Sequence, residues 1–418
     1  SYITYFCLLA QTNYWTFFYD GQILTIINTI YCIAEMVGSF IIIPIEKKFS
    51  AKFFASLLLG VSATSLIVII PLKFISNMTA RFVLTMIPVA CSGCIGAMFY
   101  PVLIAMSSKL SSVLATALQI GNGICAISFQ VLEDIISIFV PEVEDRKIYE
   151  RNLVLNAAIY YAIAIIVLLS CFFLFIKVEK IYPQCKIEAR KNHNVKMVEQ
   201  VLPEVKEAEI TNQPTDQQNN DMLQGDTVVD VAPKQGTNKK SVLSRVWFFG
   251  FSCGVSYAFS AAMFPLFVIQ VPNWHLMQTQ GKKTNDMLNL LVLTVNIFCD
   301  FMGRIIAAIK WIRKLNIKFV MVLCYIRVAL VVMFVLFNFP LVGESTKPII
   351  CSDALFYTTL ILFSTTTTMV STSGYMRYQE LVETDAEKSQ GSYIVNLFMQ
   401  SGLFVGGIAT LGMIKLFK

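Results

Sequence analysis

Long apolar segments separated by short polar loops make up most of the chain. A helix needs about 20 apolar residues to cross the hydrocarbon core of a bilayer, and the sequence accordingly predicts eleven membrane-spanning helices. They cover approximately residues 2–19, 22–45, 52–72, 82–105, 113–140, 153–176, 244–271, 287–309, 317–339, 354–375 and 392–417. The first is short and polar at Gln11-Thr12-Asn13, and the chain begins at Ser1 without Met, which leaves open whether a native segment precedes it.

One long polar segment, residues 178–243, interrupts this pattern between the sixth and seventh spans. It is rich in Asn, Gln and Asp and poor in aromatic residues, so it cannot bury enough apolar surface to fold. We therefore expect a disordered cytoplasmic linker there. The chain is predicted to be an all-α polytopic membrane protein, with a six-helix bundle at residues 1–177 and a five-helix bundle at residues 244–418.

Composition and charge agree with this class. Of the 418 residues, 56% are hydrophobic and 14% are charged, and the mean hydropathy is +0.64, whereas soluble domains carry about 25% charged residues. The net charge of +6 falls in loops, where it indicates orientation rather than nucleic-acid binding. With the N-terminus and linker in the cytoplasm, the basic loops at 47–52, 109, 310–318 and 377–388 lie inside, and the C-terminus lies outside the cell or in a lumen.

Neither a cofactor nor an enzymatic reaction is predicted. Most of the eleven cysteines lie in apolar segments, where thiols act as small hydrophobic groups. His193 and His275 lie outside the spans, so a histidine proton relay within the membrane is not available. The chain also has no Gly-x-x-x-x-Gly-Lys-Ser/Thr loop for ATP phosphates, so ATP is not an expected partner.

A few ionisable residues interrupt the apolar spans. Asp300 and Arg304 stand one helical turn apart in the eighth span, so their side chains share one face. Each charge costs about 2.5–3.5 kcal/mol at mid-bilayer, and such residues usually face a water-filled cavity or a partner. We favour a cavity for this pair. Glu35 and Arg327 lie near the middle of the second and ninth spans, where an interhelical ion pair and, for Glu35, proton coupling both remain open.

Other polar positions are weaker candidates. Gln119 and Asn122 could bind a small ligand, although the neighbouring glycines are also what helix packing selects. Phe264-Pro265 predicts a bend or hinge in the seventh span, because proline removes a backbone hydrogen bond. Glu133 and Asp134 fall toward the outer end of the fifth span, so we expect them at the membrane interface rather than on a transport pathway.

Several of these sequences together resemble the equilibrative nucleoside transporters. The resemblance rests on Ala261-Ala262-Met263-Phe264-Pro265, Asp300-Phe301-Met302-Gly303-Arg304, Arg327, Gly121-Asn122-Gly123 and Trp15-Thr16-Phe17-Phe18. The number of spans and the large loop after the sixth are also similar. The resemblance implies a major-facilitator-like fold of two bundles around a central site, in which Asp300 and Arg304 engage the ribose and Trp15 lies against the base.

The chain departs from the family pattern at two places. Tyr100 stands where many relatives carry Gln, and Ser373-Gly374-Tyr375 replaces a familiar Asn-Gly-Tyr. A tyrosine offers one hydroxyl and a ring in place of an amide. The preference among purine nucleosides, pyrimidine nucleosides and free nucleobases therefore remains open.

The predicted function is facilitated transport of nucleosides by alternating access, and the partners are the substrate and the lipid bilayer. A carrier of a sugar or an amino acid, a proton-coupled nucleoside symporter and a non-transporting receptor or scaffold are the alternatives. The plasma membrane is favoured over an organelle, and the chain is expected to act as a monomer.

Overall fold

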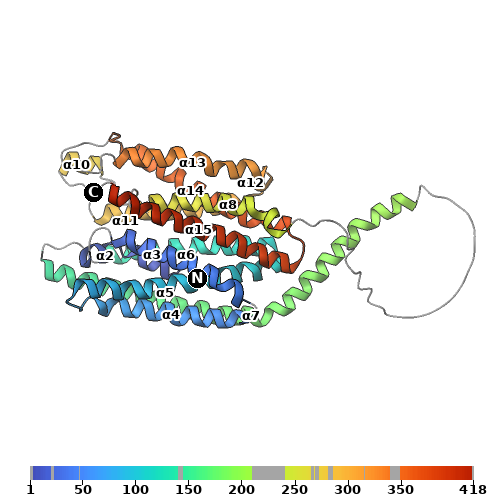
Figure 1. Ribbon diagram of the computed structural model, residues 1–418, viewed down its shortest axis with the longest axis horizontal. Helices are drawn as coiled ribbons and strands as arrows, with labels where there is room; N and C mark the ends of the chain where they lie inside the picture. The colour runs from blue at the N-terminus through green and yellow to red at the C-terminus, as the bar shows by residue number, and fades with distance from the viewer. Residues whose placement is uncertain are drawn as a thin grey trace, which may run out of the picture.

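The computed structural model describes residues 3–19, 23–46, 48–139, 145–209, 241–264, 268, 273–280, 286–314, 316–338 and 349–416. Within these ranges all regular structure is helical. The long helices run along the longest axis of the molecule in two groups, one from each half of the chain (Figure 1). The predicted all-α class with two bundles is therefore confirmed.

The N-terminal group comprises the helices up to residue 209. They are α1 (Ile3–Ala10), α2 (Thr12–Phe18), α3 (Ile23–Ile45), α4 (Ala51–Leu72), α5 (Met78–Leu110), α6 (Ser112–Phe139) and α7 (Arg146–Glu209). The C-terminal group comprises α8 (Val242–Met263), α10 (Trp274–Gln280), α11 (Asp286–Ala308), α12 (Lys310–Lys314), α13 (Ile317–Asn338), α14 (Asp353–Arg377), the 3-10 helix η1 (Tyr378–Leu381) and α15 (Asp385–Leu416).

Ten of the described helices are long and apolar enough to cross a membrane, so the chain is an integral multi-pass membrane protein. The first predicted span is instead two short helices, α1 and α2, separated at Gln11, and the count of eleven stays a prediction. Helix α7 continues to Glu209, so the part of the predicted linker from 178 to 209 is helical. Residues 210–240 of that linker lie outside the described residues.

Several helices begin at polar side chains that accept a backbone N–H, as capping residues do. Ser50 accepts from the Phe53 amide at 3.2 Å, and Asn77 accepts from the Ala80 amide at 3.1 Å. These caps place the starts of α4 and α5 just before their apolar stretches. Local sequence therefore fixes where these spans begin.

Glycines allow the closest approach between helices within the C-terminal group. A Cβ on Gly402 of α15 would overlap the carbonyl oxygen of Gly254 on α8, and one on Gly406 would overlap that of Ala258. Membrane helices pack through such small residues because lipid gives them no hydrophobic drive to associate. Helices α8 and α15 consequently form a tightly packed pair beside the N-terminal group.

Two antiparallel helix pairs join the groups. Along α3 and α15, the Asn396 amide donates to the Ser39 hydroxyl at 3.2 Å, and the Ser389 hydroxyl donates to Glu46 at 3.1 Å. Along α6 and α11, the Thr294 hydroxyl donates to Asp134 at 2.7 Å. The space enclosed between these two pairs is where a substrate could lie.

One end of this space is closed by an aromatic cluster. We call this end of the space the linker end, because α7 extends away from the molecule there; it lies on the right in Figure 1. There Tyr100 and Ile104 of α5 pack with Val246, Tyr375 and Tyr378 of the C-terminal group. The rings of Tyr100 and Tyr375 meet edge to face with centroids 6.3 Å apart. Helices of both groups thus close the central space at the linker end.

Candidate functional site

A central cavity lies between the two helical groups. It offers about 170 Å³ of space to the centres of water molecules. Its lining residues come from α1, α3, α5, α6, α8, α11, α14 and α15 and include Glu35, Tyr100, Asn122, Phe264, Asp300 and Arg304. The cavity therefore gathers residues from both halves of the chain, from Tyr5 on α1 to Leu403 on α15.

Asp300 and Arg304 form an ion pair on the cavity wall. Arg304 donates from Nε and Nη2 to Oδ2 of Asp300, at 3.2 and 3.0 Å. The Asp300 side chain is 26% exposed and that of Arg304 is 9% exposed, so the carboxylate is the more accessible partner. The helical spacing thus produces the predicted pair, and the packing of the other helices places it beside the cavity.

Arg304 also crosses between the groups. Its Nη1 donates to the carbonyl oxygen and to Oε1 of Gln119 on α6, at 3.2 and 3.1 Å. The Gln119 amide in turn donates to the Tyr100 hydroxyl at 2.7 Å. Gln119 is buried behind the wall, whereas Tyr100 and Asn122 line the cavity. The guanidinium therefore ties the C-terminal group to α5 and α6.

Close packing around Asp300 and Arg304 leaves these two side chains little freedom to move. A Cβ on Gly123 of α6 would meet the Phe301 ring at 2.8 Å and Arg304 Cδ at 3.0 Å. The Thr368 hydroxyl of α14 donates to the Asp300 carbonyl at 2.6 Å. These contacts hold the ion pair from both sides, which is the rigid support that a precise binding site requires.

Glu35 and Arg327 do not pair with each other. Arg327 donates to the Ser256 carbonyl at 2.7 Å and to Ser260 at 3.0 Å, and also to the hydroxyls of Ser256 and Thr367. Its guanidinium lies 4.3 Å from the centroid of the Phe363 ring. Arg327 thus stands behind the cavity wall, bound by neutral acceptors of its own group.

Glu35 lies in the cavity wall on α3 and is 2% exposed. Among the described residues, its Oε1 atom has no hydrogen-bond partner. The carboxyl also interacts with the Gln400 side chain of α15. A buried carboxyl oxygen without a donor is costly, so this position suggests a role in the cavity.

Helix α8 ends where the sequence predicted a bend. Met263 is its last residue, and Phe264 is extended, with φ of −97° and ψ of 136°, as the residue before a proline prefers to be. Phe264 lines the cavity at the end opposite the linker, and its carbonyl accepts from the Asn28 amide at 3.5 Å. Pro265 itself lies outside the described residues.

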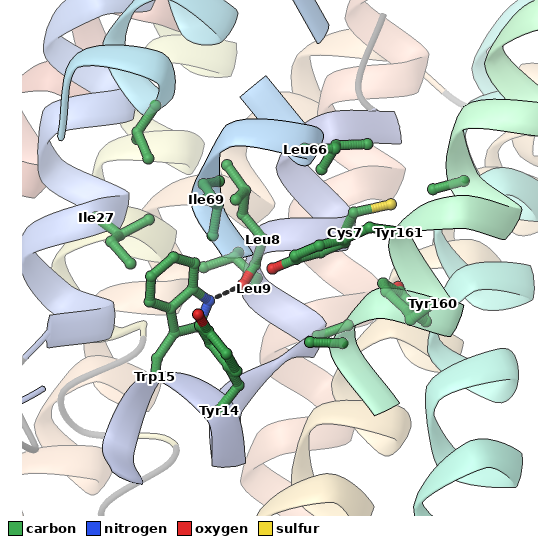
Figure 2. Packing of buried hydrophobic residues seen from close by; sticks show 14 of the residues in the cluster. Cys7, Leu8, Leu9, Tyr14, Trp15, Ile27, Leu66, Ile69, Tyr160 and Tyr161 are labelled. Carbon is green, nitrogen blue, oxygen red and sulfur yellow. Dashed lines mark hydrogen bonds between the residues drawn. The ribbon is translucent and has the colours of Figure 1, made fainter. Parts of the chain in front are cut away.

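Trp15, expected against the base, lies elsewhere. It has no exposed surface, and its indole N–H donates to the Leu8 carbonyl at 2.7 Å. Figure 2 shows the ring packed among Tyr14, Leu8 and Ile27, in the apolar core of the N-terminal group. In this conformation Trp15 is not among the residues that line the cavity, because its partners hold it inside its own bundle.

Several polar lining residues were not predicted from the sequence. Among them, Tyr5, Asn28 and Tyr257 all face the cavity. Asn28 could have been found from its spacing, because Asn28, Cys32 and Glu35 follow at intervals of four and three on one helical face. Glu133, expected at the interface, is instead 2% exposed and accepts from Gln11, Ser137 and Asn156.

Comparison with known proteins adds a family and a fold. The model of the nucleoside transporter family matches residues 86–413. No curated protein sequence matches the chain significantly.

The comparison with solved structures finds transporters. The xylose transporter XylE from E. coli, in a partially occluded inward-open conformation, is 13% identical with a TM-score of 0.50, and the match covers 100% of both chains. The E. coli fucose:proton symporter FucP is 14% identical with a TM-score of 0.45, over 99% of this chain and 96% of that one. The likeness to XylE shows a shared fold.

Proposed function

Because the chain belongs to the nucleoside transporter family and is a membrane carrier of nucleosides, we propose that the central cavity is its substrate site and works by alternating access. Asp300 and Arg304 bind the ribose, while Asn122 and Tyr100 complete the polar wall. One observation carries this proposal. The ion pair lines the cavity, and Arg304 is at the same time bound to Gln119 of the other helical group.

The chemistry of the pair suits a sugar. A ribose presents neighbouring hydroxyls that both donate and accept hydrogen bonds. Arg304 supplies several donors in a fixed fork, and the carboxylate accepts from a hydroxyl. Both bonds from Arg304 reach Oδ2 of Asp300. In this proposal, the Oδ1 atom of Asp300 accepts a hydrogen bond from a ribose hydroxyl.

Substrate binding can be coupled to movement through Gln119. A ribose hydroxyl that takes the Nη1 donor of Arg304 replaces the bonds to Gln119, and these bonds cross between the groups. Loss of the tie would favour rocking of one group against the other around a fixed site, as in alternating access. The energy comes from the nucleoside gradient alone in this proposal.

The same proposal places the N-terminus and linker in the cytoplasm of a plasma-membrane protein. Its support is the positive charge of the loops on that side, since cytoplasmic loops carry an excess of Lys and Arg. The protein is proposed to act as a monomer.

The test is uptake of a labelled purine nucleoside into proteoliposomes without ATP or an ion gradient. Asp300→Asn and Arg304→Lys should each reduce uptake about tenfold or more, because a charge-assisted pair is lost or its fork geometry is broken. Arg151→Lys, at an exposed position, is the matched control and should leave uptake unchanged.

Two results would contradict the proposal. Wild-type kinetics in Arg304→Lys would show that the site is misplaced. Competition of uptake by sugars or amino acids, without competition by nucleosides, would favour a carrier of another solute. Purified variants must keep the wild-type melting profile in detergent, because general unfolding of both would indicate a structural pair instead.

A further inference from the structure

One face of α3 carries polar groups that the ribose site does not use. Asn28, Cys32 and Glu35 all line the cavity, at the spacing that places side chains on one side of a helix. Glu35 is 2% exposed and its Oε1 atom has no donor among the described residues. Arg327 donates from its two Nη atoms to oxygens of Ser256, Ser260 and Thr367, so it does not explain this carboxyl.

An aromatic ring stands beside this face. Tyr5 of α1 is half-buried in the cavity wall, and its hydroxyl donates to Oδ1 of Asn28 at 2.9 Å. Its ring centroid lies 4.7 Å from that of Tyr31, which fixes the ring plane. Tyr5 is close enough to both Glu35 and Asp300 to interact electrostatically with each. Tyr5 therefore lines the same cavity as the ribose pair and the Glu35 carboxyl.

We propose that Tyr5 and Glu35 form the base subsite of the cavity. The Tyr5 ring stacks on the nucleobase, and Glu35 accepts a hydrogen bond from an N–H group on the base edge. This inference rests on the proposed function, because it assumes that Asp300 and Arg304 hold the ribose of the same molecule. The ligand class is a nucleoside whose base presents an N–H donor, such as inosine, guanosine or adenosine.

Physical chemistry favours this assignment over Trp15. Stacking on an aromatic side chain needs a ring that reaches the cavity; Tyr5 is half-buried and lines the cavity, whereas Trp15 has no exposed surface. A site built around a buried acceptor rejects an analogue that lacks the matching donor, because the acceptor then stays unpaired. Glu35 is thus a specificity-determining residue.

The subsite also bears on coupling between the groups. Tyr5 and Glu35 belong to the N-terminal group, whereas Asp300 and Arg304 belong to the C-terminal group. A nucleoside held at both places bridges the two, and a sugar or a base alone does not. Only the complete nucleoside would then draw both groups together around the site.

The experiment compares two substrates that differ in one donor. Inosine carries an N–H on its six-membered ring, and purine riboside carries none on its base. In proteoliposome uptake, Glu35→Met should raise the KM for inosine about tenfold, as expected for a lost hydrogen bond to a buried carboxyl. The same variant should leave the KM for purine riboside unchanged or lower it, because purine riboside leaves the wild-type carboxyl unpaired. Glu35→Gln, which keeps one acceptor and the size of the side chain, should fall between.

The ring is tested separately. Tyr5→Leu should raise the KM for both substrates about tenfold, since stacking is worth about 1–3 kcal/mol per base in nucleic-acid proteins. Tyr5→Phe keeps the ring and should have a small effect. A KM for inosine that is unchanged in Glu35→Met and Glu35→Gln would overturn the subsite, as would equal changes for both substrates.

Other outcomes are distinguishable. If an imposed proton gradient drives uptake of both substrates and Glu35→Gln abolishes that dependence, Glu35 couples protons and the subsite proposal is wrong. If the wild-type protein transports neither nucleoside, the proposed function fails. If it transports both and the variants do not discriminate between them, only the base subsite fails.

Discussion

The two buried arginines differ in their position relative to the cavity, so a charge in a membrane helix does not by itself indicate a substrate-binding residue. Arg304 lines the cavity and bonds to Asp300 and Gln119. Arg327 is 1% exposed and bonds to hydroxyls and a carbonyl behind the wall. Among its acceptors, Ser260 and Thr367 line the cavity themselves. Arg327 is therefore connected to the cavity wall through Ser260 and Thr367.

Gly303 positions Arg304 by permitting close contact between α11 and α14. A Cβ at this position would lie well inside van der Waals contact of the Thr365 carbonyl oxygen and the Thr368 hydroxyl. Gly303→Ala should destabilise the protein by about 1–3 kcal/mol, as overpacking does, and lower uptake because α11 must shift. The measurements are the melting temperature in detergent and nucleoside uptake.

Gly121→Ala provides the matched control for this prediction. A Cβ at Gly121 meets nothing within 4 Å, and alanine is favoured over glycine in a helix by about 1 kcal/mol. This variant should be as stable as the wild type or slightly more so. Equal behaviour of the two variants would show that the contact at Gly303 is unimportant.

At the residue scale, the sequence predicted those features that are determined by residues within a single helix. The spacing of Asp300 and Arg304 is enough to pair them, and the cost of two charges in a membrane is enough to expect a cavity. The burial of Trp15 and Glu133 depends instead on neighbours far away in the chain. Nothing local to Glu133 indicates that Gln11 and Asn156 donate to it.

The first predicted span is interrupted at Gln11, and the Gln11 side chain has a hydrogen-bond partner on another helix. Helix α1 ends at Ala10 and α2 begins at Thr12, with Gln11 at φ of −75° and ψ of 44° between them. The Gln11 side chain donates to Glu133 of α6. Hydrophobic periodicity could indicate the polar middle of this span, but it could not place a break that a residue 122 positions away stabilises.

Glu133→Leu should therefore loosen the junction of α1 and α2. The substitution removes the acceptor of Gln11, Ser137 and Asn156, and each buried donor left unpaired costs about 1–3 kcal/mol. The melting temperature in detergent should fall, and uptake should fall with it because α1 carries Tyr5. Glu133→Gln, which keeps one acceptor oxygen, should lose less of both. A wild-type melting temperature in Glu133→Leu would contradict this role.

At the scale of the whole molecule, sequence and structure agree on two helical groups joined by a long connection. Apolar length alone located α3, α4 and α14 to within a few residues, because a bilayer sets the length of a span. It did not show that α7 continues to Glu209, since polar residues end a span without ending a helix. Nor could it show that α3 pairs with α15, because that contact joins residues 343 positions apart.

The pairing of α3 with α15 at the linker end gives a test of alternating access. In Glu46→Cys/Ser389→Cys, a short cleavable thiol cross-linker should join the two groups where the Ser389 hydroxyl now donates to Glu46. After cross-linking, uptake should fall to background, because the linker end can no longer open. Cleavage of the cross-linker should restore uptake. Each single variant treated in the same way controls for the eleven native cysteines.

Arg245→Cys/Glu387→Cys is the matched control, because the salt bridge between these residues joins α8 to α15 within the C-terminal group. Cross-linking there should leave the uptake of that variant unchanged, since a rigid group moves as one body. If both cross-links block uptake equally, the C-terminal group itself must deform during transport. If neither blocks uptake, the linker end stays closed throughout the cycle, and the substrate must leave by a path that does not separate α3 from α15.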